Sequence, residues 1–305
     1  MLTLLKRLFG VCVASSIVFS CGNGARRDVG SQTLSASDEA LYSEVHSDSN
    51  VSRSRTYAQI IASIKGVSDR HSDVSEMVRY GTSVRGQPLT LMRIEDRSVS
   101  VEGKRPAALI SEGIHGNEYL HITDRLPEVF LEGAGNTGYK AFLAKGGVVY
   151  LVPILNPDGY DNGRRENASG TDLNRSFPIR GANYPGRTAP ETKAIRDYLA
   201  TELATHSLSL EVSMEYHCCI GALITPWAYT RSSPSIDVRA RANSVIGEMR
   251  KALGKELGAG TVHEVLNYPT VNGGSDDYYL ENYGRRAYSY EGRSGSEPSY
   301  FAGHC

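Results

Sequence analysis

Short apolar runs alternate with longer stretches of helical period along most of this chain, and that alternation limits its fold more than any other feature. The predicted strands are bounded by Gly or Pro, or alternate apolar with polar residues; they are 89–94, 107–110, 148–152, 208–214 and 286–290. The clearest helical stretches are 118–131, 189–203 and 238–257. We therefore predict a single α/β domain, whose mixed, mostly parallel sheet has helices on both faces.

The predicted domain begins near Tyr57. Three isoleucines between residues 60 and 64 have helical spacing, and Met77 to Tyr80 follow before a turn at Gly81. The strand pattern becomes visible only after this turn. We therefore expect the first strand of the sheet at residues 89–94.

The first 20 residues have the pattern of an export signal. Lys6 and Arg7 precede an apolar run that ends at Phe19, and this run is shorter than the roughly 20 residues that a membrane-spanning helix needs. The segment Val18-Phe19-Ser20-Cys21 resembles a lipobox. We therefore expect residues 1–20 to be a lipoprotein signal peptide, with Cys21 lipidated and the protein held in the cell envelope by this lipid alone. An ordinary secretory signal, cut near the same place, is the alternative.

Residues 21–54 are rich in Ser, Asp, Glu, Gly and Asn, a composition typical of a flexible tether. The folded domain is then predicted to cover residues 55–305. Outside the N-terminal segment, three cysteines remain: Cys218, Cys219 and Cys305. An oxidising compartment would allow a disulfide from Cys305 to either of the other two, and the sequence does not choose between them.

The charge balance argues against a nucleic acid partner. The chain has 33 Lys and Arg against 34 Asp and Glu, a formal net charge of −1, whereas binding to phosphates requires a local excess of basic residues. No basic stripe is visible in the sequence. We expect a monomer whose partner is a substrate rather than a nucleic acid.

Polar residues follow the predicted strands at their carboxyl ends, where functional groups collect in sheets of this type. The strand at 107–110 leads into a loop with His115 and Glu118 three residues apart, and His217 follows the strand at 208–214. Two imidazoles and one carboxylate are a familiar zinc set that leaves one coordination position for water. Arginines at 165 and 175 also fall near these ends, and cations beside a metal imply an anionic substrate.

These motifs together resemble the zinc carboxypeptidases of the funnelin group, the family of pancreatic carboxypeptidases A and B. The resemblance runs from Tyr57 to about Gly295 and is carried by the following segments: 80–86, His115 to Glu118, Asn156-Pro157-Asp158-Gly159, 165–177, Pro190-Glu191-Thr192, His217 and Gly273-Gly274-Ser275-Asp276-Asp277. It implies a zinc carboxypeptidase-like fold, one Zn²⁺ per chain, and an enzyme that hydrolyses the C-terminal bond of a peptide.

The resemblance also implies a role for each matching residue. His115, Glu118 and His217 would bind the zinc. The other matches are Glu291 as general base, Arg165 at the developing oxyanion, Asn174 and Arg175 on the terminal carboxylate, Asp172 as the orienting partner of the first zinc histidine, and Tyr268, aligned with a one-residue gap, as the mobile tyrosine over the substrate. We prefer Arg165 to Arg164 because its spacing to Asp172 matches the regulatory branch of the family.

Asp276 matches the residue at the floor of the specificity pocket. The carboxypeptidase B branch has aspartate there, so the resemblance implies a preference for C-terminal Lys or Arg. A partly desolvated acid favours a basic side chain independently of any resemblance. Ser275, Asp276 and Asp277 also suit the first turn of a helix, where acids are favoured, and both interpretations can hold.

The sequence departs from the family pattern after Glu291, where only 14 residues remain (305 − 291). We therefore expect the domain to lack the usual C-terminal helix. Two alternative functions stay open at this point. A peptidase of peptidoglycan stem peptides could use the same scaffold, since diaminopimelate also presents an amine and a carboxylate. An inactive peptide-binding lipoprotein is the other, and the complete set of catalytic residue types argues against it.

Overall fold

The computed structural model describes residues 55–133, 137–179, 188–232, 235–253, 258–284 and 286–293. The predicted signal peptide, Cys21 and the predicted tether lie outside these residues. Residues 294–305 do as well, so the absence of a C-terminal helix stays a prediction. Within the described ranges, no helix has both the length and the apolar character needed to cross a membrane.

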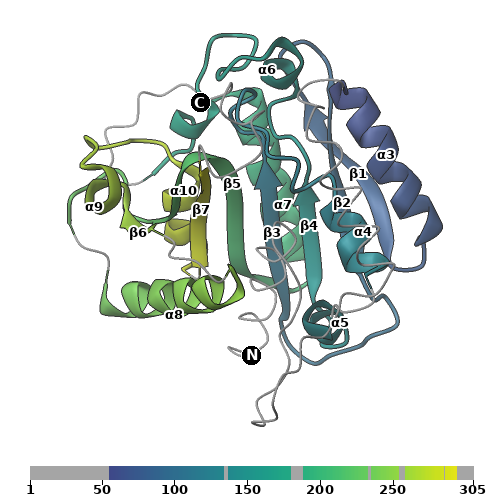
Figure 1. The fold of residues 1–305 in the computed structure, drawn as a ribbon. Coiled ribbons are helices and arrows are strands. Elements are labelled where there is room, and N and C mark those ends of the chain that lie inside the picture. The colour runs from purple at the N-terminus through teal and green to yellow at the C-terminus, as the bar shows by residue number, and fades with distance from the viewer. Residues whose placement is uncertain are drawn as a thin grey trace, which may run out of the picture.

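A seven-stranded mixed sheet lies at the centre of the molecule (Figure 1). Its order is β1-β2-β4-β3-β5-β6, with β7 paired to β5. The pairs β1/β2 and β2/β4 are antiparallel, whereas β3 runs parallel to both β4 and β5. The strands are β1 (Ser75–Thr82), β2 (Pro88–Glu95), β3 (Arg105–Glu112), β4 (Val148–Val152), β5 (Leu208–Thr225), β6 (Gly258–Thr261) and β7 (Arg286–Arg293).

The long strand β5 turns around the end of β7. In its first half the residue numbers of β5 and β7 increase together along the pairing, and His217 is paired with Glu291. Beyond Gly221, which has a φ of +73°, β5 runs back along β7, and Ala222 is also paired with Glu291. Strand β5 thus lies on both sides of β7 and holds Glu291 between two segments of backbone.

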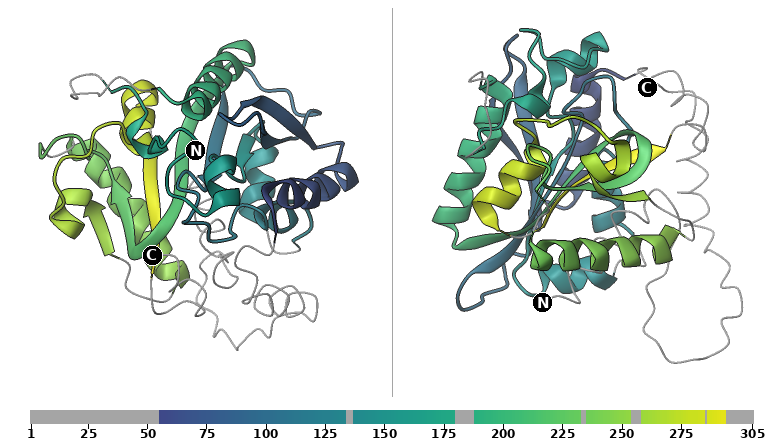
Figure 2. Two further views of the ribbon diagram at one scale, coloured as in Figure 1. Left: turned by 90° about the horizontal axis from the view of Figure 1, so that it is seen from above. Right: turned by 90° about the vertical axis from the view of Figure 1, so that its left-hand side faces the viewer.

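Helices cover both faces of the sheet (Figures 1 and 2). On one face lie α3 (Tyr57–Arg70), α4 (Leu126–Leu131), α5 (Thr137–Leu143) and α8 (Ile236–Leu253), and on the other lie α7 (Pro190–Thr205) and α10 (Ser275–Tyr283). Alternate residues of β3 serve the two cores, since Ala108 and Ile110 pack with the first group, and Ala107 and Leu109 with the second. The predicted α/β architecture is confirmed.

Three short elements complete the described part of the chain. Helix α6 (Pro157–Asn162) begins shortly after β4, a 3-10 turn covers Leu173–Arg175, and α9 (Val262–Leu266) follows β6. The predicted helices at 189–203 and 238–257 correspond to α7 and α8, although residues 254–257 are outside the described ranges.

The strand predicted at 208–214 continues to Thr225 as β5, and two further expectations were wrong. The sheet begins earlier than expected, since 77–80 belong to β1, which pairs with β2. The predicted helix at 118–131 is confined to α4, at its C-terminal end. The buried carboxylate of Glu112 is the reason, because it accepts hydrogen bonds from the backbone N–H groups of Leu120, Ile122 and Thr123. Those amides hold a loop instead of a helical turn.

Candidate active site

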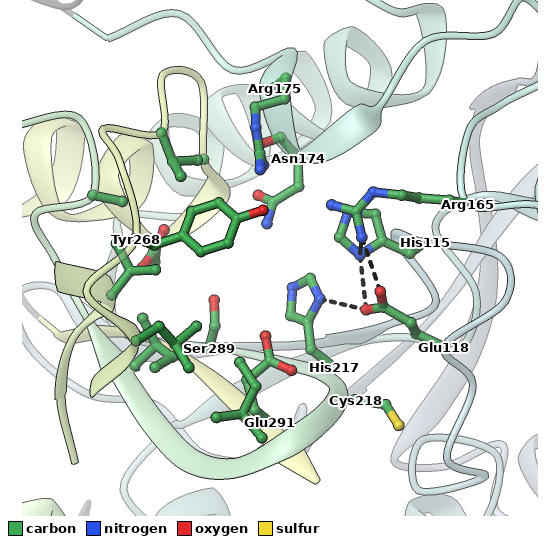
Figure 3. Close-up of a pocket in the computed structure, with 18 residues that line it drawn as sticks. His115, Glu118, Arg165, Asn174, Arg175, His217, Cys218, Tyr268, Ser289 and Glu291 are labelled. Carbon is green, nitrogen blue, oxygen red and sulfur yellow. Dashed lines mark hydrogen bonds and ion pairs between the residues drawn. The ribbon is translucent and has the colours of Figure 1, made fainter. Parts of the chain in front are cut away.

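Three side chains converge beyond the carboxyl end of β3 and beside the middle of β5. His115 and Glu118 lie in the loop after β3, and His217 lies within β5. Glu118 Oε2 is 2.8 Å from His115 Nδ1 and 3.1 Å from His217 Nδ1 (Figure 3). One nitrogen or oxygen atom of each residue lies within 4.8 Å of the others. The structure therefore brings together the three predicted zinc ligands, although His217 is 99 residues from Glu118 in the chain.

Asp172 fixes the orientation of His115. Its Oδ1 atom lies 3.2 Å from His115 Nε2, which leaves Nδ1 facing Glu118 and His217. The aspartate itself is held by Arg165, whose Nη2 is 3.0 Å from Oδ2. Burial would raise the pKa of Asp172, but the hydrogen bond to His115 and the charges of Arg165 and Arg175 hold it below its ordinary value. An ionised carboxylate behind a histidine is the usual support of a metal ligand.

The chemistry of this donor set fits a zinc ion. Burial would lower the pKa of His217, but the hydrogen bond to Glu118 and the negative charges of Glu291 and Glu215 raise it to about 9. The hydrogen bonds from both histidines likewise hold the pKa of Glu118 below its ordinary value, against the effect of burial. Surroundings that favour a positive charge so strongly suit a dication, and two imidazoles with one carboxylate are typical of catalytic zinc.

Arg165 lies directly against the metal donors. Its Nη1 atom is 2.9 Å from Glu118 Oε1 and 3.1 Å from His115 Nδ1. Its side chain is 36% exposed, and the guanidinium also faces the cavity beside the metal donors. Its position beside the ligands is compatible with the predicted role at a developing oxyanion.

Glu291 lies beside His217 on the neighbouring strand (Figure 3). Its Oε2 atom is buried and has no hydrogen-bond partner among the described residues. Burial is the main cause that raises the pKa of Glu291 to about 7, and the neighbouring charge of His217 opposes this increase. A carboxyl group that titrates near neutral pH can both accept and release a proton, as a general base must.

The cavity beside the metal donors has a volume of about 210 Å³. Asn174, Arg175 and Tyr268 are among the residues that line it, and Figure 3 shows the Tyr268 ring with its hydroxyl directed towards Asn174. Arg175 donates from Nη1 to the Asn174 carbonyl oxygen at 2.8 Å. Tyr268 is 49% exposed, which leaves its side chain room to move. All three predicted substrate-contacting residues therefore face the same cavity as the metal donors.

Asp276 is a buried acid that lines this cavity. It is only 6% exposed, and no Lys or Arg of the described ranges forms an ion pair with it. Desolvation is the main cause that raises its pKa to about 6. The adjacent Asp277 points elsewhere and accepts hydrogen bonds from the backbone N–H groups of Ala228 and Tyr229. Of these two acids, only Asp276 lines the cavity.

Two residues that support the site were missed as functional candidates. Glu112 organises the loop after His115 through the hydrogen bonds described above. Asn156 donates from Nδ2 to the carbonyl oxygens of Ile114 and Arg165, at 3.3 and 3.2 Å, and so joins the two loops. Gly116 allows this close packing, because a Cβ there would lie 2.1 Å from the carbonyl carbon of Gly159. A buried acid at a strand end was the only sequence signal for Glu112.

Cys218, the residue after the second zinc histidine, forms a disulfide. Its partner is not among the side chains that the structure describes. The thiol of Cys218 is therefore not available as a competing metal ligand while the bond is intact.

The fold and the donor set define an α/β metalloprotein of the catalytic zinc type. The model of the zinc carboxypeptidases matches residues 60–302, and the chain belongs to this family.

Individual relatives agree with this family. Carboxypeptidase SOL1 of Arabidopsis thaliana is 27% identical over 233 residues, which cover 71% of this chain and 46% of that protein. Carboxypeptidase Z of Rattus norvegicus is 29% identical over 185 residues, 48% of this chain and 28% of that protein. The chain thus spans less than half the length of these relatives. Carboxypeptidase A from Helicoverpa armigera shares the fold, with a TM-score of 0.64 at 21% identity over 83% of this chain and 70% of that one.

Proposed function

We propose that this protein is a zinc-dependent exopeptidase that removes the C-terminal residue of peptides. The observation that carries the proposal is that one cavity is lined by the metal donors, by Glu291 and by Asn174 and Arg175. The metal donors and Glu291 supply the means of hydrolysis, and Asn174 and Arg175 supply hydrogen-bond donors for a terminal carboxylate. The curated relatives named above are themselves called carboxypeptidases.

Each side chain has a task in such a reaction. Zinc at this site would supply Lewis acidity and activate water for attack on the scissile carbonyl. The Glu291 carboxylate accepts a proton from the attacking water and passes it to the leaving amine. The guanidinium of Arg175 binds the terminal carboxylate with paired donors, and Arg165 stabilises negative charge that develops on the carbonyl oxygen. Tyr268 covers the bound peptide and excludes water from it.

We further propose that the terminal residue is Lys or Arg. The cavity wall includes Ile224, Ala228 and Val271, and Asp276 is a buried acid in the same wall. Apolar walls suit the methylene stem of a long basic side chain, and a buried, unpaired carboxylate suits its charged head. A C-terminal Leu would leave the Asp276 charge without a partner, which is costly in a desolvated site.

A panel of peptides that differ only in the last residue tests both statements. We expect zinc-loaded protein to cleave hippuryl-Arg and hippuryl-Lys, to cleave hippuryl-Leu about 30-fold less efficiently or worse, and to lose all activity to a chelator. Equal turnover of the three would remove the basic preference. Purified peptidoglycan stem peptides form a second arm of the experiment. If only these are cleaved, the substrate is a stem peptide that contains diaminopimelate instead of a peptide ending in Lys or Arg. No turnover of any substrate by zinc-loaded protein would contradict the peptidase.

We also propose that the protein is exported and anchored through lipid on Cys21, on the basis of the segment Val18-Phe19-Ser20-Cys21. Incorporation of labelled palmitate by cells that express the full chain tests this proposal. The variant Cys21→Ala should lose the label, and a label that persists would contradict lipidation at this residue.

A further inference from the structure

Glu215 is a buried carboxylate on the same face of β5 as the zinc ligand His217. The two residues are separated by one position, and alternate side chains of a strand point to the same face. The register partner of Glu215 on β7 is Ser289, which lines the active-site cavity. Only 5% of Glu215 is exposed, so its carboxylate lies beneath the floor of the site.

Two polar atoms at this position have no hydrogen-bond partner among the described residues: Glu215 Oε1 and His217 Nε2. The other carboxylate oxygen, Oε2, lies 4.0 Å from His217 Nε2, and it accepts a hydrogen bond from the Ser275 hydroxyl. Leaving a buried donor or acceptor without a partner destabilises the folded state. A hydrogen bond between Glu215 Oε1 and His217 Nε2 would satisfy both atoms and remove this destabilisation.

Such a hydrogen bond is needed when His217 binds the metal. With Nδ1 directed at the metal position, the neutral imidazole carries its proton on Nε2, and this N–H requires an acceptor. His115 shows the same arrangement completed, since Asp172 lies 3.2 Å from its Nε2 atom. The 4.0 Å between Glu215 and His217 is an ion-pair distance, and the free Oε1 gives the carboxylate a second atom to offer.

We propose that Glu215 is the positioning residue of His217. It holds the proton on Nε2 and thereby presents Nδ1 to the zinc, as Asp172 does for His115. Through Ser275, the first residue of α10, it also ties this ligand to the helix that carries Asp276. The proposal rests on the zinc site and is independent of which substrate, if any, the protein hydrolyses.

Zinc affinity of the full chain tests this role directly. Competition with a chromophoric chelator gives the dissociation constant of the metal, and Co²⁺ in place of zinc gives a visible spectrum that reports ligand geometry. Loss of an orienting partner weakens metal binding by about 10- to 100-fold, so we expect Glu215→Ala to show that loss and an altered Co²⁺ spectrum. Glu215→Gln should lose less, because its amide oxygen still accepts a hydrogen bond.

Ser213→Ala is the matched control. Ser213 lies two residues before Glu215 on the same strand face, is about as buried, and has a hydroxyl with no hydrogen-bond partner among the residues that the structure describes, so the zinc affinity of this variant should equal that of the wild type. Wild-type affinity and spectrum in Glu215→Ala would overturn the proposal. If Glu215→Ala does not fold, as judged by circular dichroism, Glu215→Met takes its place, because it has a similar size and no oxygen to accept the hydrogen bond, and wild-type affinity and spectrum in that variant would likewise overturn the proposal. Because zinc binding is measured without a peptide, failure of the peptidase would appear in a different assay.

Discussion

Replacement of Asp276 by Asn should stabilise the protein and impair its action on basic residues. Burial raises the pKa of this carboxyl from 3.8 to about 6, which means that the folded state resists its ionisation. Each pKa unit corresponds to about 1.4 kcal/mol, so removing the charge should raise the free energy of unfolding at pH 7 by up to about 3 kcal/mol. Asparagine keeps an oxygen for the hydrogen bond from the Asp277 backbone N–H.

The pH dependence gives this stability difference a sign that can be checked. An acid whose pKa is higher in the folded state binds more protons there than in the unfolded state between pH 4 and 6, so stability falls as the pH rises through this range. The advantage of Asp276→Asn should therefore be absent at pH 3.5 and complete above pH 6. Urea unfolding in the presence of a chelator measures it, and an advantage that does not change with pH would refute the electrostatic explanation.

The catalytic cost should fall on basic substrates alone. Removing one partner of a buried charge pair costs about 2–5 kcal/mol, which corresponds to roughly a 30- to 5,000-fold loss of kcat/KM for hippuryl-Arg. Hippuryl-Leu should be unaffected or improved. Asp277→Asn is the control for selectivity, because Asp277 does not line the cavity. An unchanged ratio of Arg to Leu turnover in Asp276→Asn would refute our reasoning about the pocket.

Three further predictions concern the chemistry of the site. Glu291→Gln should lower kcat by about 100-fold or more and still contain one zinc per chain by elemental analysis. Turnover at the wild-type rate would exclude Glu291 as the base. Because a nearby dication lowers the pKa of a carboxyl from the value of about 7 that burial gives Glu291, kcat/KM should rise with pH through an inflection below 7. Arg175→Lys should raise KM by about tenfold or more, since a point charge cannot replace the paired donors; a KM equal to that of wild type would exclude a carboxylate contact there.

The identity of the elements was largely visible in the sequence. Apolar runs such as 148–152 and helices such as α7 follow from periodicity, which is a local property of the chain. The helix expected at 118–131 failed because Glu112, outside that segment, takes its amide groups. Local pattern carries no information about such a competing acceptor.

The three zinc ligands were predicted from polar residues at strand ends, whereas the roles of the other site residues were predicted only through the family resemblance. His115 and Glu118 are close in sequence and would attract attention in any chain, but Asp172 is 57 residues from His115 and Glu215 is 60 residues from Ser275. Glu215 lies just beyond the strand predicted at 208–214, and no pattern in the sequence assigns it a function. Only its position beneath the cavity, beside an unpartnered histidine nitrogen, indicates a function.

By itself, the sequence determined the α/β class and the set of residue types that can bind zinc, because period and composition are properties of the chain. Only the tertiary structure decided which acids are buried, which donors point at one centre, and how β5 turns around β7 to hold Glu291. The physical reason is desolvation. A carboxyl group acquires the pKa of a base or of a specificity residue only when segments distant in the chain exclude water from it.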